Sequence, residues 1–334
     1  MNSPLVSVII PCYNAEKYIR EAIDSIINQT YSNIEILCID DCSKDNTLSM
    51  LREFEVIDNR IRVYSNPINM RIAAALNVGL EHTSGTYIAR MDADDIAVHD
   101  RIEKQVKFLE AYPQIAICGG QCDVINEHGM QTGHISYPLS DEALKTLLLF
   151  DSCFAHPTVM FRKSIYNSLG GYADMMPVED VEYWTRMAIA GYKFANLPDV
   201  LLRYRHHSLQ VTSTQNDYKK IEKLKQLSSL YSSFYLNQNS WNNFNLRFFM
   251  GNWRLKTSAK DFRYITQASE EIISKNKENA QFNQKVLKKC IAYYRCRAYL
   301  SCLKSRQNSL LVRFQAFCGA LSLLSTTMRV IMSK

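Results

Sequence analysis

The chain has 334 residues, of which 47% are hydrophobic, so it can bury a sizeable core and fold as one large domain with a smaller one. Its net charge of +6 is uneven: residues 1–216 contain 18 Lys and Arg against 27 Asp and Glu, whereas residues 217–334 contain 21 against 6. Ten cysteines form no Cys-x-x-Cys pair, which argues against a zinc site and favours reduced thiols in the cytoplasm. No basic and apolar signal peptide and no uncharged apolar run of membrane-spanning length is found, and we expect a cytoplasmic protein.

Short apolar runs alternate with helical patterns along the first 90 residues. Residues 5–10 form a Val- and Ile-rich run typical of a buried parallel strand, and Pro11 is expected to end it because proline cannot extend the ladder. Asp40 lies at the tip of the second strand, where a carboxylate can accept the imide N–H of a pyrimidine base. The apolar spacing predicts strands at residues 34–39, 62–65 and 87–89 and helices at residues 15–29 and 73–81.

Three carboxylates, Asp92, Asp94 and Asp95, follow the strand at residues 87–89. Carboxylates this close repel one another and need a cation, solvent or a basic side chain to compensate them. Ligands of parallel α/β sheets bind beyond the carboxyl ends of the strands, so the Asp-x-Asp spacing indicates Mg²⁺ or Mn²⁺ shared with nucleotide phosphates. The alternative is an acidic loop in which Asp95 or Asp100 caps the next helix.

Two further acids, Glu179 and Asp180, open a predicted helix, where the helix dipole favours negative charge. A functional interpretation is also open, because a carboxylate can act as a general base that accepts a proton from a reacting group. The other elements predicted in this part are helices at residues 99–112 and 141–150 and strands at residues 115–119, 155–161 and 198–204.

Several ordered motifs resemble family 2 glycosyltransferases of the bacterial surface-polysaccharide type. The resemblance lies in residues 6–14, 40–47, 73–77, 89–95, 101–109, 156–162, 170–172, 179–180 and 204–207, about two thirds of the chain. It implies a GT-A fold, an α/β structure whose mixed central sheet is flanked by helices. We therefore expect a GT-A domain over residues 1–214 and a basic, mostly helical C-terminal region over residues 215–334.

The resemblance also implies roles for individual residues. Asp94 would bind the metal, Asp92 the metal or the ribose, and His207 the metal or the leaving diphosphate, although His207 could instead face solvent after its strand. Asp180 would be the general base, with Glu179 beside it binding or orienting the acceptor. The residues implied to line the pocket for the nucleotide base and ribose are Pro11, Tyr13, Asn14 and Asp40.

Two positions depart from the family pattern. Arg71 stands where the family has a glycine that lets the backbone approach the donor, so its side chain is placed among the nucleotide-sugar-binding residues. Cys42 also replaces a usual glycine, which matters only if that position requires a positive φ.

The C-terminal region combines basic helices with an apolar stretch at residues 310–332. Basic faces beside apolar residues suit an anionic membrane surface, which would place the protein peripherally on the inner face of the cell membrane. A helical cap with a solvated basic face is the alternative. No recognised nucleic-acid motif accompanies the charge, so we expect no nucleic-acid partner. Co-sedimentation with anionic liposomes tests the membrane interpretation.

Together these observations predict a metal-dependent, inverting glycosyltransferase that uses Mn²⁺ or Mg²⁺. It would move a sugar from a nucleotide donor, most simply a UDP-sugar, to a glycan or lipid-linked acceptor in the synthesis of cell-surface polysaccharide or lipopolysaccharide. The rival hypothesis is a non-catalytic nucleotide-sugar-binding scaffold subunit of a membrane glycan-assembly complex. The intact pairs of acids argue against that rival, and hydrolysis of UDP-sugars by the purified protein would separate the two.

Overall fold

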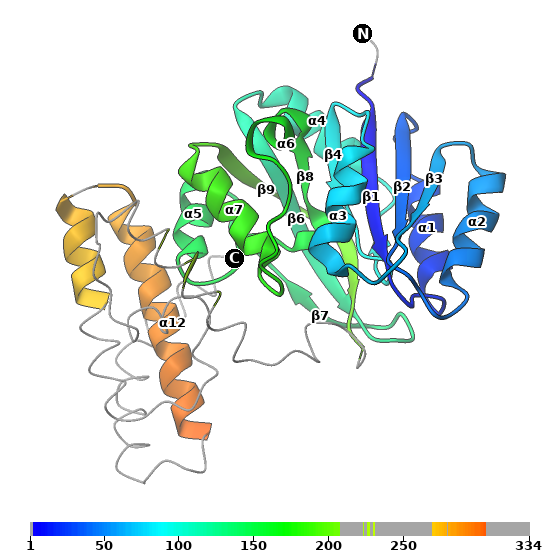
Figure 1. Ribbon diagram of the computed structural model, residues 1–334. Helices are drawn as coiled ribbons and strands as arrows, with labels where there is room; N and C mark the ends of the chain where they lie inside the picture. The colour runs from blue at the N-terminus through cyan, green and yellow to red at the C-terminus, as the bar shows by residue number, and fades with distance from the viewer. Residues whose placement is uncertain are drawn as a thin grey trace. The chain divides into compact units, whose positions relative to one another are not determined.

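The computed structural model describes residues 3–207, residues 223, 226, 227 and 230, and residues 269–278 and 280–304 (Figure 1). Two compact units divide the chain: Met1–Asp141 with Phe154–Gln215, and Glu142–Cys153 with Asn216–Lys334. The strands are β1 (Val6–Cys12), β2 (Ile34–Asp40), β3 (Ile61–Ser65), β4 (Tyr87–Arg90), β5 (Ile96–Ala97), β6 (Ile115–Ile125), β7 (Gln131–Ile135), β8 (Met160–Arg162) and β9 (Lys193–Arg205). The helices are α1 (Ile19–Ile27), α2 (Thr47–Ile57), α3 (Arg71–Glu81), α4 (Arg101–Ala111), α5 (Asp141–Leu148), the short 3₁₀ helix η1 (His156–Thr158), α6 (Lys163–Leu169), α7 (Glu179–Ile189) and α12 (Gln284–Lys304).

The first unit is built on a mixed sheet whose strand order is β3-β2-β1-β4-β8-β6-β9-β5, with β7 paired to β6. Strands β1 to β4 run parallel to their partners within this group, whereas β8 is antiparallel to both of its neighbours. This is the mixed central sheet flanked by helices that the sequence predicts.

Strand β1 is apolar at almost every position because helices cover both faces of the sheet. Val8 and Ile10 belong to the core cluster that also contains Ile19 of α1. Ile9 contacts α3 instead, since a Cβ on Gly79 of that helix would lie only 2.5 Å from the Ile9 Cγ2 atom. Glycine at this position therefore lets α3 approach the sheet closely.

β1 continues through Pro11, in register with Ile39 of β2, and ends at Cys12, two residues beyond the predicted run of residues 5–10. The backbone of Ile9 points towards β4, since its carbonyl accepts the Met91 N–H at 3.1 Å. Alternate residues of a strand direct their backbone groups to the same side, so Pro11 also faces this side, past Arg90, the last residue of β4. No ladder hydrogen bond is needed there, and proline is tolerated.

The strand predicted at residues 155–161 is wrong in its first half. Residues 156–158 form η1, in which the N–H and the hydroxyl of Thr158 both donate to the carbonyl of Ala155. Pro157 favours this turn because its fixed φ suits the start of a helix. Only residues 160–162 join the sheet, as β8.

The strand pairing brings several loops to one edge of the sheet. β1 and β2 end together, with Cys12 in register with Asp40, and β4 ends beside them because Arg90 pairs with Ile9. β9 runs antiparallel to β5, with Arg203 opposite Ile96, so the last residues of β9 pass the acidic loop that precedes β5. Residues far apart in the sequence therefore meet at the carboxyl ends of the parallel strands.

In the second unit a helix at residues 269–278 is joined to α12 by the side chain of Asn276. The amide nitrogen of Asn276 donates to the carbonyl of Phe282 (2.7 Å) and to Gln284 Oε1 (2.6 Å), while its oxygen accepts the Phe282 N–H. Residues 142–153 belong to the same unit, where Phe150 stacks on Tyr294 of α12. The sequence analysis did not foresee this grouping.

None of the helices in the described parts of the chain has the length and apolar character that crossing a membrane requires. The apolar stretch at residues 310–332, on which the expected membrane contact depends, lies outside the described residues. The membrane interpretation therefore stays a prediction.

Candidate active site

Three carboxylates form a cluster directly after β4. Asp92, Asp94 and Asp95 each offer an oxygen, and these oxygens lie within 4.8 Å of one another. Asp95 is buried, and its Oδ2 atom has no hydrogen-bond partner among the described residues. The capping alternative does not hold, because α4 begins only at Arg101 and Asp100 makes no side-chain cap.

Arg90, the last residue of β4, compensates part of this negative charge. Its buried guanidinium donates two hydrogen bonds to Asp92, Nη1 to Oδ2 at 2.7 Å and Nη2 to Oδ1. Burial raises the pKa of Asp92. The charges of Asp94 and Asp180 raise it further, and the charge of Arg90 opposes the shift. Arg90 is not among the site residues that the sequence predicts: its place two positions before Asp92 is visible in the sequence, but the direction of its side chain is not.

A divalent cation fits the charge that remains. Burial raises the pKa of Asp95 well above its usual value, and the neighbouring Asp94 and Asp92 raise it further, so the cluster resists holding all its charges unaided. With Arg90 offsetting one of three carboxylates, two negative charges remain when all are ionised, which matches Mg²⁺ or Mn²⁺. Carboxylate oxygens are also the ligands these ions prefer.

His207 reaches the same cluster from the end of β9. Its Nε2 atom lies 2.9 Å from Asp94 Oδ2, and its ring contacts that of Tyr18 with the centroids 5.0 Å apart. Its side chain is only 12% exposed, so the alternative of a solvent-facing histidine does not hold. The strand pairing thus places His207 beside Asp92 and Asp94, where a histidine ligand of the same metal would have to lie.

The residues expected around the nucleotide base lie at the carboxyl ends of β1 and β2 and on the loop that follows β1. Asn14 adopts a positive φ of 49°, and its Oδ1 accepts the Lys44 N–H at 2.8 Å. The buried carboxylate of Asp40 accepts the hydroxyl of Ser65 at 3.2 Å. Pro11 and the exposed Tyr13 complete this group, because β1 and β2 end in register.

The two positions that depart from the family pattern both have positive φ, 62° at Cys42 and 69° at Arg71. The buried carboxylate of Asp41 accepts the N–H groups of Met70 (2.9 Å) and Arg71 (2.7 Å), which stabilises the conformation of Arg71. A side chain in this conformation costs about 1–2 kcal/mol. The chain therefore carries backbone strain on both loops beside the expected nucleotide pocket.

Replacing Cys42 by glycine is expected to raise the free energy of unfolding by about 0.5–1 kcal/mol, because glycine adopts a φ of 62° without strain but gains freedom in the unfolded chain. Urea unfolding measures the change. Cys42→Ala is the matched control, since it also removes the thiol but keeps the Cβ atom. A glycine variant no more stable than the alanine variant would contradict the strain argument.

Glu179 and Asp180 lie in the first turn of α7. Glu179 is buried, and its Oε2 atom has no hydrogen-bond partner within the described part of the chain. Burial raises the pKa of Glu179 to about 7, and the charges of Asp180 and Asp92 contribute to the shift. Since Asp180 also raises the pKa of Asp92, the two pairs of acids share one electrostatic environment.

This pKa predicts how stability depends on pH. The unfolded chain loses the Glu179 proton near pH 4.5 and the folded chain near pH 7, so the unfolding free energy should fall as pH rises between these values. Glu179→Gln should remove up to about 3 kcal/mol of this fall. Urea unfolding at pH 4.5 and 7.5 in EDTA measures it, and equal slopes for the two proteins would contradict the prediction.

A buried polar layer lies next to these acids. His156 Nε2 contacts the hydroxyl of Tyr172 at 3.1 Å, and Asn77 holds the Tyr172 backbone with two hydrogen bonds of 2.8 and 2.7 Å. Burial, with Arg90 nearby, lowers the pKa of His156 well below its usual value, so the imidazole is neutral. The contact with Tyr172 gives His156 a structural role in this layer.

Comparison with known proteins gives a consistent result. A family model described as "Glycosyl transferase family 2" matches residues 7–170. An uncharacterized glycosyltransferase of Haemophilus influenzae is 40% identical over 247 residues, which cover 71% of this chain and 76% of the relative. The O-antigen biosynthesis glycosyltransferase WbnJ of Escherichia coli is 33% identical over 209 residues, or 61% of this chain and 80% of WbnJ.

Among solved structures, the crystal structure of S. aureus TarS 1-349 in complex with UDP-GlcNAc superposes with a TM-score of 0.57. The match covers 89% of both chains at 18% sequence identity. A likeness at this identity shows the fold, and the predicted GT-A architecture is confirmed.

Proposed function

The chain belongs to glycosyl transferase family 2, and from this premise we propose that it is an inverting enzyme that transfers a sugar from a UDP-sugar to a glycan or lipid-linked acceptor. One observation carries the proposal: the charge of Asp180 raises the pKa of Asp92, so the acids that open α7 lie within electrostatic reach of the carboxylate cluster after β4. A sugar transfer needs the carboxylate cluster to hold the metal that binds the diphosphate, and it needs a separate carboxylate to activate the acceptor.

The donor is proposed from the loops after β1 and β2. The Asp40 carboxylate lies at the end of β2, where it can accept the imide N–H of uracil, while Asn14 and Tyr13 are on the adjacent loop. Pro11 lies at the end of β1 beside them. The side chain of Arg71 replaces the family glycine near the donor, which makes it a candidate contact to the diphosphate or the sugar.

Metal dependence is proposed from the donor set described above. Asp94 and Asp92 would hold Mg²⁺ or Mn²⁺ with His207, and Asp95 supplies a further oxygen to the cluster. The bound cation would stabilise the negative charge on the departing diphosphate. Arg90 keeps the Asp92 carboxylate in a fixed orientation through its paired hydrogen bonds.

Asp180 is proposed as the general base. The resemblance to the family places the base at this position, and Glu179 lies beside it, buried and with its pKa raised to about 7. Asp180 would take the proton of the acceptor hydroxyl as that oxygen attacks the anomeric carbon and the bond to the diphosphate breaks. Attack from the face opposite the leaving group gives inversion.

A role in surface-polysaccharide synthesis is supported by the relatives, of which WbnJ is named for O-antigen biosynthesis. The experiment is a panel of nucleotide sugars tested with the full chain and Mn²⁺, read by thermal shift and by release of free nucleotide. A donor at 100 times its Kd would add roughly 2.7 kcal/mol of stability. Binding of UDP-sugars without turnover would favour the scaffold hypothesis, and no binding of any nucleotide sugar would overturn the proposal.

A further inference from the structure

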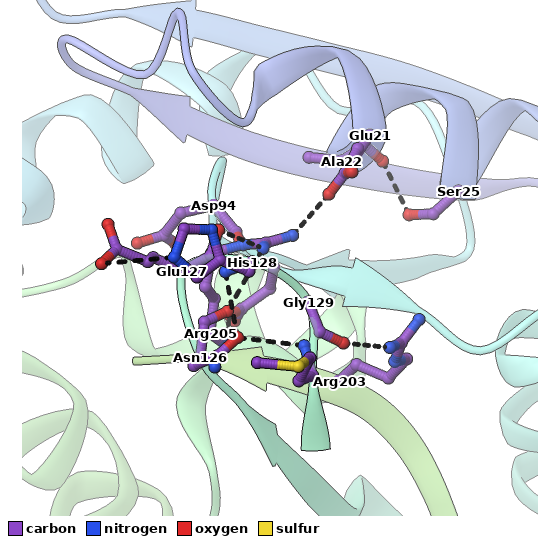
Figure 2. Close-up of polar contacts among 12 residues, drawn as sticks. Glu21, Ala22, Ser25, Asp94, Asn126, Glu127, His128, Gly129, Arg203 and Arg205 are labelled. Atoms are coloured by element: carbon purple, nitrogen blue, oxygen red, sulfur yellow. Dashed lines mark hydrogen bonds and ion pairs between the residues drawn. The ribbon is translucent and has the colours of Figure 1, made fainter. Parts of the chain in front are cut away.

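Arg205 lies at the end of β9, two residues before His207, and its guanidinium is the centre of the contacts drawn in Figure 2. Its Nη2 atom donates to the carboxylate of Glu21 on α1 at 2.5 Å. Its Nη1 atom lies 3.5 Å from the carbonyl of Asn126 and 3.4 Å from that of Glu127, in the turn between β6 and β7. One side chain therefore joins three segments that are distant in the sequence.

The same residue contacts the acidic cluster twice. Its Nε atom donates to the main-chain carbonyl of Asp94 at 2.8 Å, and its own N–H donates to Asp95 Oδ1 at 2.8 Å. Its guanidinium also lies over the ring of Tyr18, 4.6 Å from the centroid, and the same ring contacts His207. Arg205 thus contacts Asp94 and Asp95 directly and shares the Tyr18 ring with His207.

The distribution of charge in this contact is unusual for a residue that only stabilises the fold. The Arg205 side chain is 2% exposed, whereas its carboxylate partner Glu21 is 60% exposed. A buried guanidinium paired with a solvated carboxylate is held mainly by the geometry of its several hydrogen bonds, because solvent screens the attraction between the charges. The forked guanidinium lets one side chain make all these contacts, and its charge-assisted hydrogen bond to Glu21 anchors it.

We propose that Arg205 is a positioning residue, anchored by Glu21, that fixes the main chain at Asp94 and so sets the affinity of the cluster for a divalent cation. The inference rests on the proposed function, which includes the divalent cation. It assigns no contact between Arg205 and substrate. Groups that orient metal ligands contribute 10- to 100-fold to metal affinity in proteins, which is the size of effect the arrangement predicts.

The test compares three variants. Arg205→Lys keeps the positive charge but cannot contact Glu21, the Asp94 carbonyl and the β6–β7 turn at once. Glu21→Gln removes the anchoring charge at an exposed position, so it should fold even if the first variant does not. Arg203→Gln is the matched control, because Arg203 lies on the same strand and donates to the carbonyl of Gly129 in the same turn, but is exposed.

Binding of Mn²⁺ to the full chain is measured by electron paramagnetic resonance without donor or acceptor, and folding is checked by thermal unfolding. We expect the Kd for Mn²⁺ to rise at least tenfold in Arg205→Lys and about threefold in Glu21→Gln, and to be unchanged in Arg203→Gln. Where turnover can be measured, excess Mn²⁺ should restore kcat, which a merely structural defect would not allow.

An unchanged Mn²⁺ affinity in folded Arg205→Lys would overturn the proposal; if that variant does not fold, an unchanged affinity in Glu21→Gln would do so. An equal loss in Arg203→Gln would also overturn it, since the effect would then belong to the turn as a whole. These results do not depend on sugar transfer: a wild-type protein that binds Mn²⁺ but no nucleotide sugar would refute the proposed function alone.

Discussion

Asp180→Asn should lower kcat by about 10²–10⁴ and leave the affinity for the nucleotide sugar close to that of the wild-type protein. The amide is almost the same size as the carboxylate but cannot accept the proton of the acceptor hydroxyl. Asp180 lies in the first turn of α7 and acts electrostatically on Asp92, so it is close to the proposed metal without belonging to the cluster. Its loss should affect the chemical step more than binding of the donor.

Steady-state kinetics with saturating donor and Mn²⁺ measure kcat, and titration calorimetry with the intact UDP-sugar measures its Kd. Glu179→Gln is the informative comparison, because it alters the neighbouring acid and keeps the proposed base. We expect it to retain more activity than Asp180→Asn. Wild-type turnover by Asp180→Asn would refute the assignment of the base, whatever the outcome for the metal.

Asp94→Asn is expected to reduce Mn²⁺ affinity and turnover by at least 100-fold. The substitution removes one of the two charges that Arg90 leaves uncompensated and weakens the contact with His207 Nε2 at 2.9 Å. A neutral amide oxygen is a much poorer ligand for a hard divalent cation than a carboxylate oxygen. Donor binding in the presence of Mn²⁺ should weaken with it, because the diphosphate then lacks its counter-charge.

The chain offers a matched control for this variant. Asp123 Oδ1 lies 2.9 Å from His134 Nδ1 on the β6–β7 hairpin, so Asp123→Asn breaks a similar carboxylate–imidazole contact away from the cluster. We expect it to have near wild-type metal binding and activity. Electron paramagnetic resonance for Mn²⁺ and nucleotide release for turnover separate the two variants, and an equally weak response to Mn²⁺ in both would count against a metal at Asp94.

Some features of the site were missed because the sequence shows neither the direction in which a side chain turns nor the distant residue that it meets. Arg90 immediately precedes the acidic loop, yet nothing in the sequence says that its guanidinium turns back onto Asp92 rather than facing solvent. Arg205 could be noticed only as part of a motif, since its contacts with Glu21 and Asp94 require β9 to run past β5 and α1. Long-range hydrogen bonds of this kind leave no periodic pattern in the chain.

Local errors in the predicted elements have equally local causes. Proline usually ends a strand, but at Pro11 the neighbouring strand β4 has already stopped, so the missing N–H carries no penalty. The apolar run at residues 155–161 looked like one strand, but Pro157 and the hydrogen bonds of Thr158 to Ala155 turn its first half into η1. In each case a tertiary neighbour or a turn overrode the intrinsic preference.

The sequence by itself determined the alternation of buried strands and amphipathic helices, the acidic pairs at the ends of β4 and at the start of α7, and the family to which they belong. These follow from local spacing, because apolar periodicity and short motifs are written in consecutive residues. Only the tertiary structure decided that His207 meets Asp94, that Arg90 neutralises Asp92 and that Glu179 holds its proton up to about pH 7. The first depends on the pairing of β9 with β5 and β6, and the other two depend on burial and on the direction in which neighbouring charged side chains turn.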